Sequence, residues 1–265
     1  MRPLLPVLLL AACPALAGTW DDLAPRVFGD RPLLDGAAVI TLDAPYRTDT
    51  DSRTRLAARI AAPEGTLLRE VTLIIDENPM PVSAVIRLTA PQAAFRFDGT
   101  FRINGPTPLH LVAETADGRL FAVAGHVKTS GQGACAAPPG TDPAAALATL
   151  GQMTLSLGPD PGTGPVERLA RLAGAQGHLE LDIRHPSHSG MQMDQISLLY
   201  IPMRYVETLD IAIDGQPFAT VTGSISLSEN PHLGLSVPPG ARRAAVELTD
   251  TDGTVTTART ALPGY

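Results

Sequence analysis

Glu70-Val71-Thr72-Leu73-Ile74-Ile75 is the stretch that decides the fold, because β-branched and aliphatic residues in such a run favour an extended strand. The next residues, Asp76-Glu77-Asn78-Pro79-Met80-Pro81, break the run with two prolines. A second apolar run follows over residues 85–88. This order of strand, turn and strand predicts an all-β protein.

The same pattern extends on both sides of this stretch. Alternating runs bounded by turn signals predict strands at residues 38–42, 55–61, 70–75, 85–88, 94–102, 109–113 and 120–127. The turn signals are Asp98-Gly99, Asn104-Gly105 and Asp117-Gly118. Short strands at this spacing indicate a β-sandwich of immunoglobulin-like size.

A second series of strands follows residues 142–147, which have the composition of one or two helical turns. Its strands are expected at residues 153–157, 178–183, 205–213, 219–223, 234–237, 244–248 and 254–260, with hairpin turns at Asp214-Gly215 and Asp252-Gly253. The stretch 158–177 fits either a helix over 165–175 or an irregular insertion. The fold expected is therefore two immunoglobulin-like β-sandwich domains in tandem.

The domain boundaries follow from these series and from the composition between them. A signal peptide is expected over residues 1–17, and the first sandwich over 18–137, ending in a cysteine loop. Residues 138–150, which begin rich in proline and glycine, are the natural linker. The second sandwich is expected over 151–265.

The N-terminus indicates export. Arg2 precedes a short apolar core, and Ala15-Leu16-Ala17 has the small residues of a cleavage site. A competing reading is a lipoprotein box, Leu10-Ala11-Ala12-Cys13, in which Cys13 would be kept and lipidated. No later segment reaches the about 20 apolar residues of a membrane-spanning helix. A soluble, exported protein of the periplasm of a Gram-negative bacterium is expected.

Charge excludes one class of function. The formal net charge of −7 argues against a nucleic-acid-binding protein, which would carry a basic face. Lys128 is the only lysine among 20 basic residues.

Cys135 is the one cysteine left after removal of the leader. It lies among small and loop-forming residues, Gly131-Gln132-Gly133-Ala134-Cys135-Ala136-Ala137. A single thiol in an oxidising compartment indicates intermolecular linkage or reactivity, although an incidental surface thiol is the plain alternative. Lys128 would lower the pKa of the thiol only if the loop folds back onto it.

Several motifs in order resemble the SoxY and SoxZ subunits of the bacterial sulfur-oxidising Sox system, joined in one chain. The first half resembles SoxY in residues 74–81, in residues 119–128 and in the cysteine loop. The second half resembles SoxZ in residues 183–190, 228–233 and 249–255. The chain also resembles the fused SoxYZ-like carriers associated with quinoprotein dehydrogenases.

The resemblance implies that Cys135 covalently holds a sulfur-linked intermediate on a carrier arm formed by Gly131, Gln132, Gly133, Ala134, Ala136 and Ala137. It also implies no catalysis and no cofactor in this chain. The implied partners are periplasmic redox enzymes of the Sox type, a quinoprotein dehydrogenase or a cytochrome c. The implied SoxY-like and SoxZ-like halves pair within the chain.

The arm departs from the family pattern. The family usually ends SoxY in Gly-Gly-Cys-Gly-Gly, whereas here the loop is held at both ends and has alanines at Ala134, Ala136 and Ala137, which stiffen it. Thiosulfate and other sulfur or thiol adducts therefore both remain open as cargo. A two-sandwich adaptor or ligand-binding module with an incidental or dimer-forming Cys135 is the alternative function.

Other residues allow metal-binding interpretations, each of which has a simpler structural alternative. His185 and His188, with His178 or His232, could form a metal cluster, although hydrogen-bonded histidines are the commoner case. Asp250-Thr251-Asp252-Gly253 resembles the start of a calcium loop but lacks the closing glutamate, so a hairpin turn is expected. Met191 and Met193 could bind copper, or fill a core or an interface. Motifs of hydrolases, nucleotide-binding proteins and zinc proteases are absent.

Overall fold

The computed structural model describes residues 19–131, 133–134, 143–159, 176–193 and 198–262. The predicted signal peptide, Cys13, Cys135 and residues 160–175 lie outside the described residues. The chain divides into two units, Met1–Arg31 and Pro32–Tyr265.

One helix, α1 (Thr19–Phe28), makes up most of the described part of the first unit. It ends at Gly29, whose φ of 66° lies in the left-handed region and whose N–H donates to the carbonyl of Pro25 at 2.9 Å. This is a common way to satisfy the last carbonyls of a helix. No helix among the described residues is long and apolar enough to cross a membrane.

Strands dominate the second unit, which we divide into a first half (residues 32–134) and a second half (residues 143–262). The strands of the first half are β1 (Leu33–Asp35), β2 (Ile40–Asp43), β3 (Thr54–Ala61), β4 (Leu68–Ile75), β5 (Val82–Gln92), β6 (Ala94–Phe101), β7 (Thr107–Thr115) and β8 (Leu120–Val127). The second half begins with the short helix α2 (Pro143–Ala148) and continues with β9 (Met153–Pro159), β10 (Gly177–Ile183), β11 (Val206–Ile213), β12 (Gln216–Thr222), β13 (His232–Val237), β14 (Arg243–Asp250) and β15 (Val255–Ala261).

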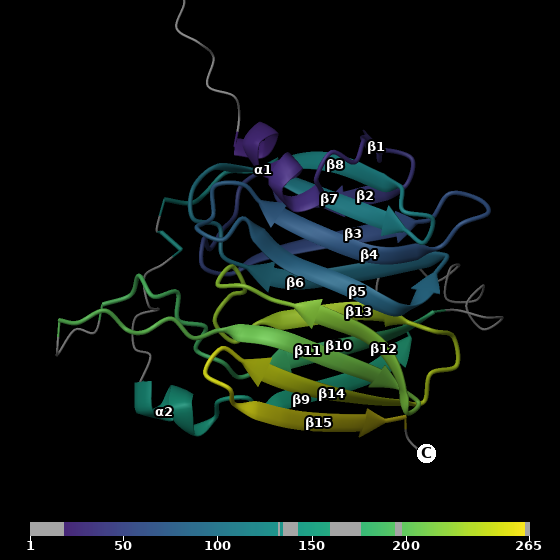
Figure 1. Cartoon of the computed structure of the whole chain (residues 1–265). Coiled ribbons are helices and arrows are strands. Elements are labelled where there is room, and N and C mark those ends of the chain that lie inside the picture. Colours follow the sequence, from purple (N-terminus) through teal and green to yellow (C-terminus); the bar gives the residue numbers. More distant parts are fainter. Residues whose placement is uncertain (1–18, 132, 135–142, 160–175, 194–197, 263–265) are drawn as a thin grey trace, which may run out of the picture. The chain divides into compact units, whose positions relative to one another are not determined.

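Two sheets pack face to face (Figure 1). The larger has nine strands in the order β1-β8-β7-β4-β5-β12-β11-β14-β15, and the smaller has six in the order β2-β3-β6-β13-β10-β9. Apolar residues of both sheets form one continuous core cluster. The expected fold class, all-β with immunoglobulin-like sandwiches, is confirmed.

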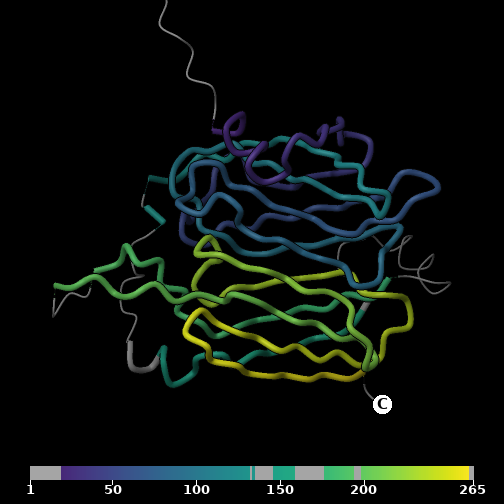
Figure 2. Tube along the Cα trace, in the orientation of Figure 1, coloured from purple at the N-terminus to yellow at the C-terminus, as the bar shows by residue number. Residues whose placement is uncertain are grey.

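Both sheets run without a break from the first half into the second, and Figure 2 shows the two halves adjoining. In the larger sheet β5 pairs antiparallel with β12, and in the smaller sheet β6 pairs antiparallel with β13. Each half would otherwise expose two unpaired strand edges, which are sites of aggregation. The two sandwiches are therefore joined edge to edge through both sheets.

The side chains of β6 point alternately into the core between the sheets and to the outer face of the smaller sheet. Phe95, Phe97 and Phe101 are at most 2% exposed and point between the sheets. Successive strand residues point to opposite faces, so Asp98 lies on the outer face of the smaller sheet.

All fourteen predicted strands are confirmed, with their ends shifted by at most four residues. The turn expected at Asp98-Gly99 is wrong, because both residues lie inside β6. A Cβ atom on Gly99 would lie 2.8 Å from Leu233 Cδ2, so this glycine serves close packing against β13 instead. The helix α1 and the three-residue strand β1 were not expected.

Candidate functional site

The predicted carrier cysteine and half of its predicted arm lie outside the described residues, namely Cys135, Gln132, Ala136 and Ala137. The structure does describe Lys128 to Gly131, Gly133 and Ala134, which we call the arm root. The arm root follows β8 directly, as the sequence predicted.

Asp51 holds the arm root through three backbone donors. The N–H of Ser130 donates to Asp51 Oδ1 at 2.6 Å, and the N–H groups of Gly131 and Gly133 donate to Oδ2 at 3.1 and 3.0 Å. Asp51 is 1% exposed. Such converging N–H groups form a concave anion site, here filled by a carboxylate of the same chain.

The two glycines are required by this geometry. Gly131 has a φ of 94° and Gly133 a φ of 82°, in the left-handed region that other residues rarely adopt. Burial raises the pKa of Asp51, but the hydrogen bonds from Ser130, Gly133 and Gly131 outweigh burial and hold the pKa below its ordinary value. Asp51 is therefore charged while it anchors the arm root.

A loop before β3 runs beside the arm root. The N–H of Lys128 donates to the carbonyl of Tyr46, and the N–H of Thr48 donates to the carbonyl of Lys128, both at 2.9 Å. Arg47 Nη1 donates to the carbonyl of Thr129 at 2.8 Å. These bonds form a short parallel pairing that leads the chain from β8 toward Asp51.

The only lysine of the chain, Lys128, contacts Tyr46 in the loop beside the arm root. Lys128 Nζ lies 2.5 Å from the hydroxyl oxygen of Tyr46 and 4.7 Å from the centre of its ring. Ala134, the residue that precedes Cys135, is 1% exposed and therefore packs against the protein. Whether Lys128 acts on the thiol stays a prediction, because Cys135 lies outside the described residues.

Asp51 is a residue of the candidate site that sequence reasoning missed. It appears in the sequence only as part of an acidic turn at residues 49–51. Its partner Ser130 lies 79 positions later, and no local pattern connects the two.

An open groove of about 460 Å³ lies beside the arm root. Its lining is mainly polar: Asp43, Pro45, Arg47, Thr48, Asp49, Thr50, Arg53, Thr54, Arg55 and Ala57. Arg53 also reaches the second half, where its Nη1 donates to the carbonyls of Glu229 and Asn230 at 2.9 and 2.7 Å. The groove thus lies on the first half, and Arg53 in its lining connects it to the second half.

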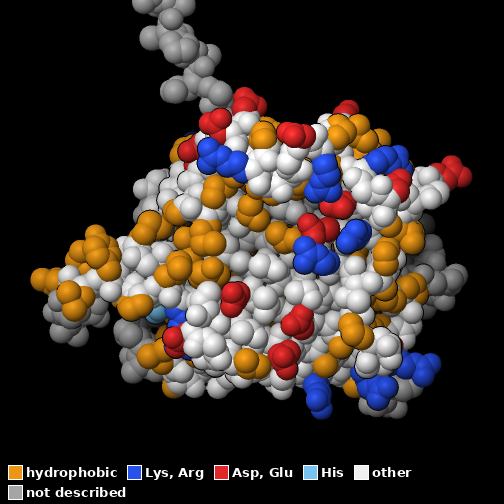
Figure 3. All heavy atoms as spheres, viewed as in Figure 1, with side chains coloured by type: hydrophobic (Ala, Val, Ile, Leu, Met, Phe, Trp, Pro, Cys, Tyr) orange, Lys and Arg blue, Asp and Glu red, His pale blue; other side chains and the backbone are white. Residues whose placement is uncertain are grey.

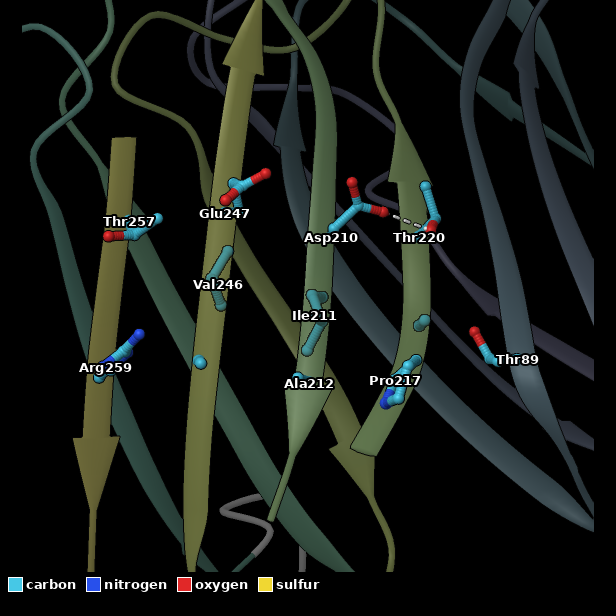
Figure 4. Close-up of a pocket in the computed structure, with 12 residues that line it drawn as sticks. Thr89, Asp210, Ile211, Ala212, Pro217, Thr220, Val246, Glu247, Thr257 and Arg259 are labelled. Carbon is cyan, nitrogen blue, oxygen red and sulfur yellow. Dashed lines mark hydrogen bonds between the residues drawn. The ribbon is translucent and has the colours of Figure 1, made fainter. Parts of the chain in front are cut away.

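Another concave region, shown in Figure 4, lies away from the arm root. It has a volume of about 300 Å³ and crosses β11, β12, β14 and β15 on the larger sheet. Asp210 in this region accepts a hydrogen bond from Thr220 Oγ1 at 2.6 Å. Its lining contains neither histidine nor cysteine, and we assign it no chemistry.

His178 and His232 lie around Asp98 on the outer face of the smaller sheet. Arg55 donates to Asp98 Oδ2 from Nη2 at 2.9 Å and from Nε at 3.2 Å, and His232 Nε2 lies 3.6 Å from the same oxygen. His178 Nε2 lies 4.0 Å from Oδ1. Because Asp98 and Arg55 belong to the first half and both histidines to the second, this polar cluster connects the halves.

The cluster shifts the pKa values of its members in opposite directions. Burial opposes ionisation of Asp98, but the hydrogen bonds from His232 and Arg55 outweigh it and lower the pKa of Asp98 to about 2. Asp98, and next to it Asp182, raise the pKa of His232. A Cβ atom on Gly234 would lie 2.6 Å from Asp98 Oδ1 and 2.8 Å from His178 Nε2, so only glycine fits there.

His185 and His188 make separate hydrogen bonds. The N–H of Ser187 donates to His185 Nδ1 at 3.0 Å, and His188 Nδ1 lies 2.7 Å from Gln192 Oε1. Burial lowers the pKa of His185 to about 4, although Asp250 lies 3.5 Å from its Nε2. Within the described ranges, no three histidine, cysteine, aspartate or glutamate side chains gather as a metal site.

Asp250 starts the expected hairpin turn between β14 and β15. Its Oδ1 accepts the N–H groups of Asp252 at 3.0 Å and Thr254 at 2.8 Å, and its Oδ2 accepts Arg204 Nε at 2.7 Å. Gly253 has a φ of 81° in this turn. The Asp-Thr-Asp-Gly sequence is thus a hairpin turn whose first carboxylate is occupied by protein donors.

Comparison with known proteins gives two family matches on this chain. The family model described as sulfur oxidation protein SoxY matches residues 24–135, and the one described as sulphur oxidation protein SoxZ matches residues 168–261. Among solved structures, the sulfur carrier protein SoxY from Chlorobium limicola f thiosulfatophilum is 18% identical, covers 42% of this chain and 96% of its own, and has a TM-score of 0.37. No curated protein matches the chain.

Proposed function

This chain joins a SoxY domain to a SoxZ domain, and we propose that it holds a sulfur-linked intermediate on Cys135 and presents it to partner redox enzymes. The two domains indicate a carrier role in sulfur oxidation. The observation that supports Cys135 as the attachment point is the hydrogen bonding of the arm root to Asp51, whose last donor, Gly133, lies two residues before this cysteine.

An anchored root suits a carrier for a physical reason. The backbone N–H groups that would otherwise need water are satisfied by Asp51, so the arm root keeps a fixed place on the rigid sandwich. A group tethered at Cys135 would then be presented at high effective concentration to an enzyme docked on that sandwich. Catalysis belongs to the partners in this proposal.

Loading requires only an accessible thiolate. In an exchange reaction, the Cys135 thiolate forms a new sulfur–sulfur bond while the sulfur–sulfur bond of the incoming compound breaks and its leaving thiolate departs. No electron is gained or lost overall, so no external oxidant is consumed. Disulfide-type sulfur and thiol compounds load in this way, whereas coupling of thiosulfate itself to the Cys135 sulfur releases two electrons, which a partner redox centre such as that of a cytochrome c would have to accept.

The proposed compartment is the periplasm, reached through cleavage of the signal peptide after Ala17. An oxidising compartment gives a lone thiol few roles other than exchange or linkage. The proposed partners are Sox-type enzymes, a quinoprotein dehydrogenase or a cytochrome c.

Intact-mass spectrometry without reductant, on protein purified from the periplasm of its native host, tests the proposal. We expect a mature chain that begins at Gly18 and carries an adduct which reductant removes and which is absent in Cys135→Ala. An unmodified thiol in every preparation would favour the adaptor function instead. A diacylglyceryl mass on Cys13 would move the protein to a membrane anchor.

A further inference from the structure

A projecting hairpin extends from the second half between β10 and β11. Its described parts are residues 188–193 and 198–204, which we call the apolar finger (Figure 1). The N–H of Arg204 donates to the carbonyl of His188 at 3.0 Å, and the N–H of Ile201 donates to the carbonyl of Gln192 at 2.8 Å. Two isolated bridges, His188 with Arg204 and Met193 with Tyr200, hold its sides together.

The apolar finger exposes large hydrophobic side chains to solvent. They are Met191 at 42%, Met193 at 50%, Leu198 at 68%, Leu199 at 68%, Tyr200 at 67% and Met203 at 51%. Figure 3 shows the hydrophobic colour concentrated on this projection. Scattered exposed hydrophobic residues are ordinary on a protein surface, but a group of six on one projecting element marks an interaction site.

A rigid base presents the apolar finger. Arg204 at its end donates from Nε to Asp250 and from Nη2 to Thr254 Oγ1, both at 2.7 Å. Gly190 has a φ of 78°, and a Cβ atom there would lie 3.2 Å from Met203 Cβ. A preorganised base reduces the entropy lost on binding, so the finger suits docking.

The base of the apolar finger and the arm root lie at the same end of the sandwich. His185, just before the finger, donates its N–H to Asn230 Oδ1 at 3.1 Å. The carbonyl of Asn230 accepts Arg53 Nη1 at 2.7 Å, and Arg53 lies two positions from Asp51, which holds the arm root. The contacts therefore run continuously from the finger to the root of the carrier arm.

We propose that the apolar finger is the docking element for the enzymes that act on the group carried by Cys135, and that it inserts into an apolar recess beside the active-site entrance of such an enzyme. This inference rests on the proposed carrier function. A carrier has to meet more than one enzyme, and three methionines in the finger suit this need because their flexible, polarisable side chains adapt to different surfaces.

Charge favours a protein rather than a membrane as the occupant. Residues 188–203 contain neither lysine nor arginine and carry one acidic residue, Asp194. Helices and loops that bind anionic bilayers depend on lysine and arginine for attraction to the headgroups. The finger lacks this attraction.

The test combines a finger variant with a matched control in the full mature chain. The finger variant is Leu198→Ser with Leu199→Ser and Tyr200→Ser, at three exposed positions whose replacement leaves the core intact. The control is Leu67→Ser, which removes a side chain 41% exposed. Leu67 precedes β4, whose first residue, Leu68, pairs with Thr115 at the end of β7. Val127, which leads into the arm root, pairs with Thr107 at the start of β7, so Leu67 and the arm root lie at opposite ends of this strand.

The first step identifies the partner by photo-crosslinking. In the native host, p-benzoylphenylalanine replaces Leu199 in one strain and Leu67 in another. We expect a cross-link from position 199 to a second protein, which is then purified and added to wild-type carrier bearing its adduct. This protein has to change the mass of the adduct on Cys135. A cross-link only to a second copy of this chain, or finger-dependent binding to phosphatidylglycerol vesicles, would overturn the inference.

The second step measures the rate at which the purified partner converts the adduct. Because a few central residues contribute most of the energy of an interface, we expect the finger variant to react at least about tenfold more slowly and Leu67→Ser to react at the wild-type rate. Equal rates for the finger variant and the wild-type chain would refute the docking role alone. Absence of any adduct on wild-type Cys135 would instead refute the carrier function, so the two failures are distinguishable.

Discussion

Ser130 donates its backbone N–H to Asp51 Oδ1 at 2.6 Å, across 79 positions of sequence. This contact fixes the start of the loop that bears Cys135 on the body of the first half. Asp51 is in turn tied to the end of β6, because its carbonyl accepts the N–H of Ile103 at 2.8 Å. Asp51 therefore fixes the arm root to the sandwich, with its carboxylate bound to the arm root and its carbonyl bound to Ile103.

Asp51→Ala should release the arm root. The N–H groups of Ser130, Gly131 and Gly133, which belong to exposed residues, lose their shared acceptor and turn to water instead, and a hydrogen bond of this kind contributes about 0.5–1.5 kcal/mol. We expect faster amide hydrogen exchange over residues 128–134 and a lower free energy of unfolding. Asp49→Ala is the control, because Asp49 is exposed. Unchanged exchange at the arm root in Asp51→Ala would show that other contacts suffice.

Asp98 should make the free energy of unfolding of the protein depend on pH in the acidic range. The pKa of Asp98 is about 2 in the fold and 3.8 ordinarily, so its contribution is fully present above pH 4 and is lost as the pH falls toward 2. The shift corresponds to about 2 kcal/mol. Urea unfolding of the wild-type chain and of Asp98→Asn should therefore differ more at pH 6 than at pH 2.5. A difference that does not vary with pH would contradict the low pKa.

Gly234→Ala should destabilise the junction between the halves. The added Cβ would lie 2.6 Å from Asp98 Oδ1 and 2.8 Å from His178 Nε2, in a buried cluster that has no room for it. Overpacking of this kind costs about 1–3 kcal/mol. The urea midpoint should fall accordingly, whereas Gly105→Ala, with no atom within 4 Å of its added Cβ, should keep the wild-type midpoint. Similar midpoints for the two variants would argue against the crowding.

Cleavage of the linker should leave the halves together. A protease site placed within residues 138–140 cuts the chain, but β5 still pairs with β12 and β6 with β13. Thr100 Oγ1 and Ser228 Oγ, 2.7 Å apart, and Arg102 Nη1, which donates to the carbonyl of Leu227 at 2.8 Å, add buried bonds across the junction. Size-exclusion chromatography should show one peak after cleavage. Two peaks of half the mass would mean that the covalent link holds the halves together.

The sequence by itself determined the strands and many of their turns. Alternating and β-branched runs such as Glu70 to Ile75 predicted strands because a pleated, half-buried backbone selects those residues locally. Asp214-Gly215 and Asp252-Gly253 predicted hairpin turns because positive φ favours glycine and tolerates aspartate. The order of motifs predicted the SoxY and SoxZ domains for the same reason, since each motif is a local pattern.

Only the tertiary structure decided how these elements meet. The local Asp98-Gly99 signal failed because packing of Gly99 against Leu233 and of Asp98 against Arg55 and His232 outweighs turn preference. The pairing of β6 with β13 and the capture of Ser130 by Asp51 join residues far apart in the chain. Periodicity reports which face of a strand is buried but not which distant strand or carboxylate it meets, because that choice depends on the folding of the whole chain.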